Sequence, residues 1–536
     1  MIKKIMAVIK DNWQLFGLAF AIIYSIYAVE LNNATTLDHM WDFNGVDYIL
    51  EDGKFPKVQL PSLSINSILN YFLGGRSSVV ITNFIWWFLG LFGISIYTRQ
   101  FVPKFLMMIC LALSATVITR LFDKHTKNEK TKYVILILAL ISFINPLFIE
   151  VWSYTALEWT IGILCGVVAA LLFAKKHYVW SGFLVWLSVG FYECYFENFL
   201  ILCTAYIYLK YKNTIKKDTF IAYFKMLLTG GIPVAINLIC QKGSAIILSW
   251  METAKNATAG VASEDVVQSS SSIKANIMFN DIPNRIYNYG VVYFTHIVGD
   301  VFGYYPKYFL YAILLIMFIT TSCIICKRYG FIAELHFILF FVFEIIWFLI
   351  VFIGTMYWIE ARIAWNVFMA ISMMFIVFLV HSEFADKQHV LHLFFLTLII
   401  FSIVNIYTTN SKTTDYYIAR ASDHQYLDCV QAEIDRYEES TGNKVTKIYT
   451  LIRYDITQQS QYLLLQANVN AYDRRLVSKD WSDVEALNYY EGENYISLPM
   501  TGEDYITYFA DKKRYAQFVP EEQLVFVDDA LYWDIY

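Results

Sequence analysis

Charged residues are scarce in this sequence of 536 residues. Asp, Glu, Lys and Arg make up 16% of it, whereas a typical soluble globular chain carries roughly 25%. Hydrophobic residues make up 57% and aromatic residues 18%, which is more than a water-facing surface can accommodate. The composition excludes an ordinary soluble protein and predicts an integral membrane protein.

Cysteine is scarce as well, with 8 residues, most of them in apolar segments. Cys323 and Cys326 form a CxxC pair inside such a segment, which is typical of two thiols that pack on one helix face. We therefore predict neither a disulfide framework nor a zinc site from the cysteines. Basic residues occur in short runs between apolar segments, so nothing indicates nucleic-acid binding.

The net charge of −5 is unevenly distributed along the chain. Residues 411–536 contain 12 Lys and Arg against 22 Asp and Glu, whereas residues 1–410 contain 29 against 24. We therefore expect two domains. The first is a polytopic membrane body at 1–408 with outer loops at 30–60 and 251–307, and the second is a soluble acidic domain at 409–536.

Long apolar runs predict the number of membrane spans, because a bilayer core needs about 20 apolar residues per helix. The run 220–250 is apolar, and Gly230, Gly231 and Pro233 predict a kink in it. The weaker run 61–75 is either a further crossing or an amphipathic helix at the interface. We expect about 11–13 transmembrane helices, the strong candidates being 12–29, 79–97, 104–122, 133–150, 156–174, 178–193, 197–210, 308–326, 330–355, 362–381 and 389–408.

Short basic loops predict the orientation, because Lys and Arg resist translocation. Lys3, Lys4 and Lys10 place the N-terminus in the cytoplasm. The basic loops at 123–132, 174–177, 210–218, 326–330 and 381–389 are predicted on the same side. The first loop and the C-terminal domain are then extracytoplasmic.

Acidic residues gather in the loops that are predicted to face outward. Asp38 and His39 follow the first span, with Asp42 close behind. A carboxylate there can remove a proton from a hydroxyl or bind a metal ion that screens a phosphate. The alternative for this loop is a solvated acidic surface.

Further ionisable residues lie near the outer ends of predicted spans, where charge is costly and by default indicates function. The alternative for each is a place in the aromatic belt at headgroup level. Arg362 is suited to a lipid-linked phosphate, because a guanidinium binds it bidentately. The candidates at these ends are Glu150, Tyr154, Glu158, Glu193, Glu197 and Arg362.

The C-terminal domain is predicted to be a small α+β unit. Leu427, Val430, Ile434 and Tyr437 form one helical stripe that ends near Gly442. Residues 445–452 and 523–529 are predicted strands. The domain has neither a Gly-rich phosphate loop nor a nucleophile elbow, so we expect it to dock or to help bind an acceptor rather than to perform chemistry.

Three motifs carry a family resemblance. Asp38-His39 and then Gly53-Lys54-Phe55 are similar to a DD-like pair followed by a Gly-basic-aromatic step. Tyr192-Glu193 is similar to a Tyr-Gln step. The segment N-P-F-F-x-E-x-x-S-Y is matched through Asn145, Pro146, Phe148, Glu150, Ser153 and Tyr154. Together these motifs resemble a bacterial membrane glucosyltransferase family, that of the O-antigen glucosyltransferases.

The resemblance implies a GT-C-like polytopic helical enzyme in the bacterial plasma membrane. Such an enzyme transfers a hexose, here glucose, from a polyprenyl-phosphate donor to a cell-surface polysaccharide or glycolipid. Asp38 would be the base, with His39 beside it, and Arg362 would hold the lipid phosphate. No cofactor is certain, and a divalent cation is the one candidate. The residues implied in substrate binding are Asp42, Glu150, Tyr154, Glu158, Tyr192, Glu193 and Arg362.

Other functions share the predicted location. A lipid-linked oligosaccharide flippase or other transporter would carry repeated halves and charges at the bilayer midplane, and neither is seen in the sequence. A polysaccharide polymerase would act at the same face. A catalytically inactive surface protein is the third alternative, because His39 replaces an expected Asp.

Overall fold

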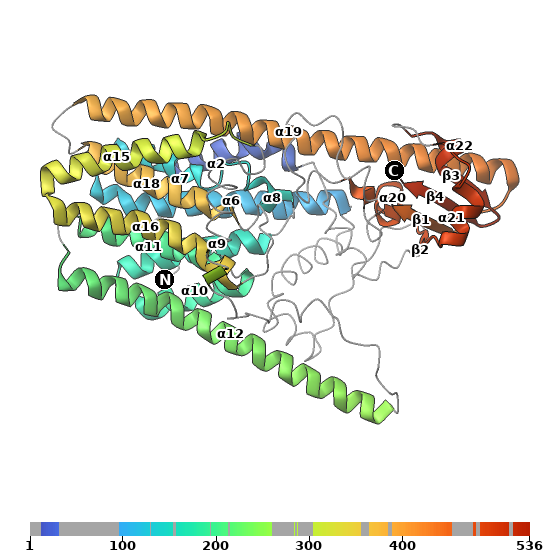
Figure 1. Cartoon of the computed structure of the whole chain (residues 1–536), viewed down its shortest axis with the longest axis horizontal. Helices are drawn as coiled ribbons and strands as arrows, with labels where there is room; N and C mark the ends of the chain where they lie inside the picture. The colour runs from blue at the N-terminus through green and yellow to red at the C-terminus, as the bar shows by residue number, and fades with distance from the viewer. Residues whose placement is uncertain are drawn as a thin grey trace. The chain divides into compact units, whose positions relative to one another are not determined.

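A computed structural model describes most of the chain in helices and a small sheet (Figure 1). Contacts divide the described residues into unit 1, up to Thr409, and unit 2, from Asn410 onward. The residues described are 12–31, 96–128, 130–153, 157–192, 195–212, 215–259, 283–284, 287, 304–354, 364–383, 388–452, 475–478, 483–513 and 518–535.

Unit 1 is a bundle of apolar helices. Over its described residues, the helices are α2 (Trp13–Tyr27), α6 (Ile96–Phe122), α7 (Thr131–Ile141), α8 (Ile149–Ser153), α9 (Leu157–Ala174), α10 (Tyr178–Phe191), α11 (Phe196–Lys210), α12 (Lys217–Ala259), α15 (Phe309–Tyr329), α16 (Phe331–Gly354), α18 (Asn366–Glu383) and the first part of α19 (Gln388–Thr441).

Six of the described helices, namely α6, α9, α12, α15, α18 and α19, are long and apolar enough to cross a membrane. Helix α18 lies at the centre of the bundle, since 94% of its most apolar window is buried, against 22% for α12 and 28% for α15. The outer helices therefore expose apolar side chains such as Ile239 and Leu315. In water this exposure would be costly.

Two glycines allow three helices of the bundle to pack closely. Gly162 and Gly166 lie one turn apart on α9, and a Cβ at Gly162 would stand 2.8 Å from Cδ2 of Tyr195. A Cβ at Gly166 would stand 3.1 Å from the Tyr195 carbonyl oxygen. The Ser188 hydroxyl of α10 donates to the Gly162 carbonyl at 2.8 Å. Small residues at this spacing let helix backbones approach one another.

Unit 2 packs the last part of α19 with four strands. The strands are β1 (Lys447–Ile452), β2 (Ile496–Pro499), β3 (Leu524–Val527) and β4 (Ala530–Ile535). Their order in the sheet is β2-β1-β4-β3, with β1 parallel to β2 and β4 and with β3 antiparallel to β4. The described residues of this unit also form short α-helices, namely α20 (Asp483–Glu491), α21 (Gly502–Phe509) and α22 (Pro520–Gln523).

A buried ion pair joins segments of unit 2 that are far apart in sequence. Asp423 of α19 accepts from Arg420 at 3.1 Å, from Arg475 at 3.5 Å and from the backbone N–H of Leu476 at 2.8 Å. Burial raises the pKa of the Asp423 carboxyl, and the two arginines oppose that shift.

Several predicted elements are confirmed. Leu427, Val430 and Ile434 are buried on α19, which ends at Thr441, and Gly442 follows with φ of +76°. Its N–H bonds to the Glu438 carbonyl at 2.8 Å, as expected where a helix ends in a left-handed glycine. The two predicted strands correspond to β1 and β3.

Several predicted boundaries are wrong. The span expected at 133–150 ends earlier, because α7 stops at Ile141, and the loop expected at 251–307 starts later, because α12 runs to Ala259. A loop was expected between the spans 79–97 and 104–122, but α6 begins at Ile96 and continues through Pro103. The loop expected at 381–389 begins later, because α18 runs to Glu383 and buries His381. Gly230, Gly231 and Pro233 lie inside one continuous helix, α12. The runs 79–95 and 61–75 lie outside the described residues.

Candidate functional site

The structure describes four of the candidate residues. Glu150, Glu158, Tyr192 and Glu197 lie in unit 1, and the three glutamates are only 1%, 4% and 1% exposed. The other candidates lie outside the described residues, namely Asp38, His39, Asp42, Tyr154, Glu193 and Arg362.

Glu158 and Glu197 occupy the first turns of α9 and α11. A carboxylate in this position interacts favourably with the positive end of the helix dipole. Helix α10 runs back between short connections and contacts α9, and α11 also contacts α9. Helices α9 and α11 therefore point in the same direction, and both carboxylates lie at one end of unit 1.

Glu197 is held by a residue from another part of the chain. Its Oε2 accepts a hydrogen bond of 2.8 Å from Nδ2 of Asn366, the first residue of α18. Both side chains are buried. Burying a carboxylate is costly unless it is hydrogen-bonded, so this contact ties α11 to the central helix.

Glu150 is brought to the same end by a turn that Asn145 builds. The Asn145 Nδ2 donates to the carbonyls of Ile141 and Ser142, at 3.3 and 3.0 Å, and its Oδ1 accepts from the Phe148 N–H at 3.0 Å. These bonds satisfy backbone groups at the end of α7, where the helix has no partners of its own. Glu150 follows in the first turn of α8.

A series of aromatic contacts links the helices that carry these glutamates. Ring centroids lie 5.1 Å apart for Trp159 and Tyr192, and 5.5 Å for Tyr192 and Tyr195. The series continues from Tyr195 to Trp365 at 6.3 Å and from Trp365 to Phe148 at 5.0 Å. Tyr192 is half-buried, whereas the other four are buried. We call the region defined by Glu150, Glu158, Glu197 and Asn366 the acidic end.

The opposite end of unit 1 is basic. Glu383 is the last residue of α18. Its backbone carbonyl accepts from Nζ of Lys127 at 2.9 Å, and its carboxylate accepts from the Lys127 backbone N–H at 3.0 Å. Nearby, the Tyr206 hydroxyl donates to the Ala174 carbonyl at 3.4 Å, and Lys210 lies over the Tyr206 ring. We call this region the lysine end and define it by Lys124, Lys127, Lys175, Lys176, Lys210, Lys212 and Arg328.

Sequence reasoning missed two buried histidine–tyrosine pairs in unit 1. Nε2 of His381 lies 2.8 Å from the Tyr208 hydroxyl, and Nε2 of His336 lies 3.3 Å from that of Tyr223. The signal was available, because a histidine inside an apolar helix is costly unless it has a partner. Glu344 of α16 is likewise fully buried.

The described residues also hold one group that could bind a metal ion. His424 and Asp428 of α19 and Glu491 of α20 place their ligand atoms within 4.8 Å of one another. His424 and Asp428 are four residues apart on one helix face, but Glu491 comes from a distant segment, so spacing in the sequence did not predict the group. It lies in unit 2.

The acidic end can perform proton transfer and bind hydroxyl groups. Buried carboxylates are strong hydrogen-bond acceptors, and the half-buried Tyr192 offers a ring edge and a hydroxyl. The fold and this site therefore define a class: a bundle of apolar helices that gathers carboxylates and aromatic rings at one end.

The family follows from comparison with known proteins. The family described as glucosyl transferase GtrII matches residues 80–379, which is more than half of the chain. The chain therefore belongs to the glucosyl transferase GtrII family, as the sequence motifs predicted, and membership implies glucosyltransferase activity. No curated protein matches the chain.

The matched range places the candidate residues in two groups. All four residues of the acidic end fall inside it, as do positions 154, 192, 193 and 362. Asp38, His39 and Asp42 precede it, and unit 2 follows it.

Proposed function

We propose that the chain is an integral-membrane enzyme that transfers glucose from a polyprenyl-phosphate donor to O-antigen or a related surface glycan. Transfer takes place at the outer face of the bacterial plasma membrane. The observation that carries the proposal is the acidic end itself: three carboxylates are buried at one end of an apolar bundle, inside the range that matches a glucosyl transferase family.

The distribution of charge in unit 1 supports the proposed orientation. Basic side chains collect at the end opposite the carboxylates, and an excess of Lys and Arg is typical of cytoplasmic loops. The acidic end then faces outward, where a surface glycan is accessible. Unit 2 follows as an extracytoplasmic domain at 409–536, after a membrane body at 1–408.

Each candidate residue has a proposed role. A base takes the proton of an acceptor hydroxyl. The hydroxyl oxygen bonds to the anomeric carbon of the donor sugar, and the bond from that carbon to the phosphate oxygen breaks. Asp38 is the proposed base, with His39 beside it. Arg362 stabilises the charge that develops on the polyprenyl phosphate. The residues proposed to bind sugar are Asp42, Glu150, Tyr154, Glu158, Tyr192 and Glu193.

A transfer assay tests this proposal. The full chain, purified in detergent, is incubated with polyprenyl-phosphate [¹⁴C]glucose and O-antigen lipopolysaccharide. Asp38→Asn and Glu150→Gln are compared with the wild type, and Glu334→Gln is the matched control, because Glu334 bonds to Ser322 at the far end of the bundle. Loss of a general base typically reduces the rate by about 10²–10⁴-fold.

The outcomes separate the base from the activity. A loss confined to Asp38→Asn makes this residue the base, and a loss confined to Glu150→Gln assigns the base to the acidic end of the bundle. The proposed donor is wrong if the wild type neither hydrolyses polyprenyl-phosphate glucose nor transfers glucose from it, but accepts a nucleotide-linked sugar.

A further inference from the structure

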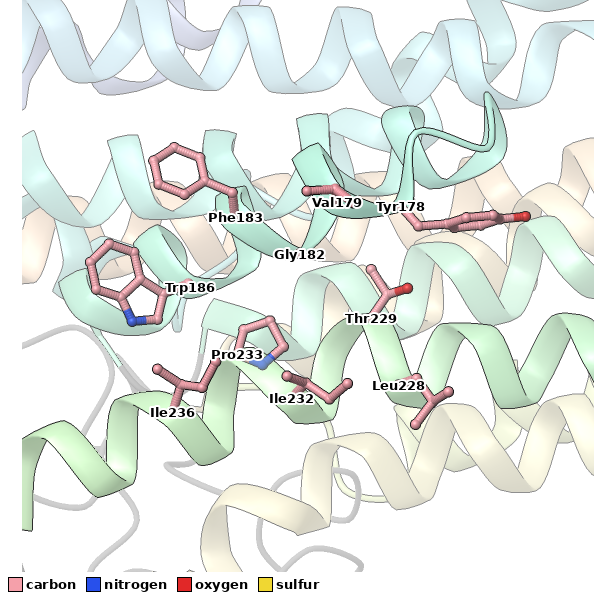
Figure 2. Close-up of a pocket in the computed structure, with 10 residues that line it drawn as sticks. All are labelled: Tyr178, Val179, Gly182, Phe183, Trp186, Leu228, Thr229, Ile232, Pro233 and Ile236. Carbon is pink, nitrogen blue, oxygen red and sulfur yellow. The ribbon is translucent and has the colours of Figure 1, made fainter.

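An apolar groove runs between α10 and α12 on the outside of unit 1 (Figure 2). Its volume is about 600 Å³. Val179, Phe183 and Trp186 line one side, and Leu228, Ile232 and Ile236 line the other. Val179 is 85% exposed and Ile232 is 53% exposed, so protein does not cover these side chains.

Glycine and proline shape this groove. Gly182 presents no side chain, and a Cβ there would lie 3.5 Å from the Thr229 carbonyl oxygen and 3.6 Å from Cγ of Pro233. The two helices therefore approach each other at Gly182, while the larger side chains on either side leave the hollow. Figure 2 shows Tyr178 and Leu228 at one end of the groove and Trp186 and Ile236 at the other.

One end of the groove carries positive charge. Nζ of Lys225 lies 5.2 Å from the centroid of the Tyr178 ring, which lines the groove at that end. Lys175 and Lys176 are exposed in the turn that leads into α10. The other end is lined by Trp186 and Ile236, and none of the groove's described lining residues is itself charged.

We propose that this groove binds one anionic phospholipid from the leaflet at the lysine end. Its acyl chain lies along the apolar walls, and its phosphate lies between Lys225 and the turn that holds Lys175 and Lys176. The charge pattern favours this occupant, since basic pockets between membrane helices bind anionic headgroups. The proposal rests on the membrane placement of unit 1 proposed above and is independent of glucosyl transfer.

Native mass spectrometry of the full chain in detergent tests the proposal. The protein is titrated with phosphatidylglycerol and, separately, with phosphatidylcholine of the same acyl chains. A lysine near an anionic lipid surface contributes about fivefold in affinity. We therefore expect Lys225→Gln to weaken phosphatidylglycerol binding about fivefold, and Lys176→Gln/Lys225→Gln to reduce it to the level of phosphatidylcholine.

Three further variants keep the result independent of misfolding. Lys225→Arg retains the charge and should retain binding. Lys132→Gln is the matched control, because Nζ of Lys132 lies 5.4 Å from the Tyr133 ring at the start of α7, away from the groove. Ile232→Trp fills the groove and should weaken both lipids equally.

Three results would overturn the proposal. The first is equal binding of the two phospholipids to the wild type. The second is phosphatidylglycerol binding that survives in the double variant or that falls as much in Lys132→Gln. The third is displacement of phosphatidylglycerol by equimolar polyprenyl phosphate, which would assign the groove to the donor lipid. Loss of glucosyl transfer alone bears on the proposed activity and leaves this lipid site standing.

Discussion

The two ends of unit 1 differ in how they accommodate charged side chains in an apolar bundle. At the acidic end the carboxylates of Glu150, Glu158 and Glu197 are buried, and Asn366 of another helix donates a hydrogen bond to Glu197. At the lysine end Lys175, Lys176 and Lys210 are exposed. Long flexible side chains carry charge outward at little cost, whereas short buried carboxylates need a fixed partner. Fixed polar geometry is therefore concentrated at the acidic end.

The largest expected effect comes from filling the space at Gly162 that lets α9 pack closely against Tyr195. In Gly162→Val the added carbon atoms meet the Tyr195 ring, which lies 2.8 Å from an ideal Cβ. We expect a loss of about 3 kcal/mol of stability, measured as thermal unfolding in detergent. Gly231→Val is the control, because nothing lies within 4 Å of a Cβ there. Equal losses in the two variants would contradict the packing argument.

The next comparison removes one carboxylate from each end. Glu197→Ala removes the buried hydrogen bond that Nδ2 of Asn366 donates to the carboxylate and should cost about 2 kcal/mol. Glu383→Ala removes a carboxylate that bonds to Lys127 and Thr131 at a partly exposed site. It should cost less than about 1 kcal/mol. Chemical denaturation monitored by tryptophan fluorescence measures both, and a larger loss in Glu383→Ala would reverse the contrast.

The lysine end also contains a buried hydrogen bond between two side chains, Tyr208 and His381, and its removal tests whether that end is uniformly tolerant. Tyr208→Phe deletes the hydroxyl that lies 2.8 Å from Nε2 of the buried His381. We expect a loss of about 1–2 kcal/mol. Tyr206→Phe serves as the control, because its hydroxyl makes a longer bond, 3.4 Å, to Ala174. If the two variants unfold at the same temperature, the pair has no structural role.

The smallest effect is a dependence on pH at the lysine end. Burial, with the charges of Arg328 and Lys127, lowers the pKa of Lys212. A lysine whose pKa is lower in the folded state loses its proton there first, so stability should rise as the pH increases from the folded-state pKa toward the ordinary value of about 10.4. Unfolding temperatures measured between pH 7 and 10 should show this rise in the wild type. The rise should be smaller in Lys212→Gln and unchanged in Lys132→Gln.

Prediction from sequence succeeded where a local pattern determines the outcome. Apolar runs and the helical stripe that ends at Gly442 are patterns of neighbouring residues. They predicted the helices, and local patterns also predicted strands β1 and β3. β2 and β4 were missed because β2 has only four residues and because both pair in parallel with β1 across long separations. The apolar runs 79–97 and 104–122 were expected to be separate spans, yet Pro103, which lies between them, sits inside α6, where tertiary packing outweighs local propensity.

The candidate site shows the same limit. Glu150 and Glu158 were identified from their places near predicted helix ends, because charge at such places is costly. Asn366 was not, since its role depends on Glu197, which lies 169 residues earlier in the chain. An asparagine at the start of an apolar helix gives no local signal that distinguishes a partner of a carboxylate from an ordinary helix terminus.

The lengths of the helices between the two ends have a consequence for the surrounding membrane. Helices α10 and α11 contain 14 and 15 residues, so each rises roughly 21–22 Å. A typical hydrocarbon core is about 30 Å thick. In the membrane placement proposed above, with the lysines at one headgroup level, the carboxylates would lie several ångströms below the other, in a local depression of the bilayer. Glucosyl transfer in vesicles should therefore be faster in lipids with short acyl chains, and membrane thickness becomes a variable of the reaction.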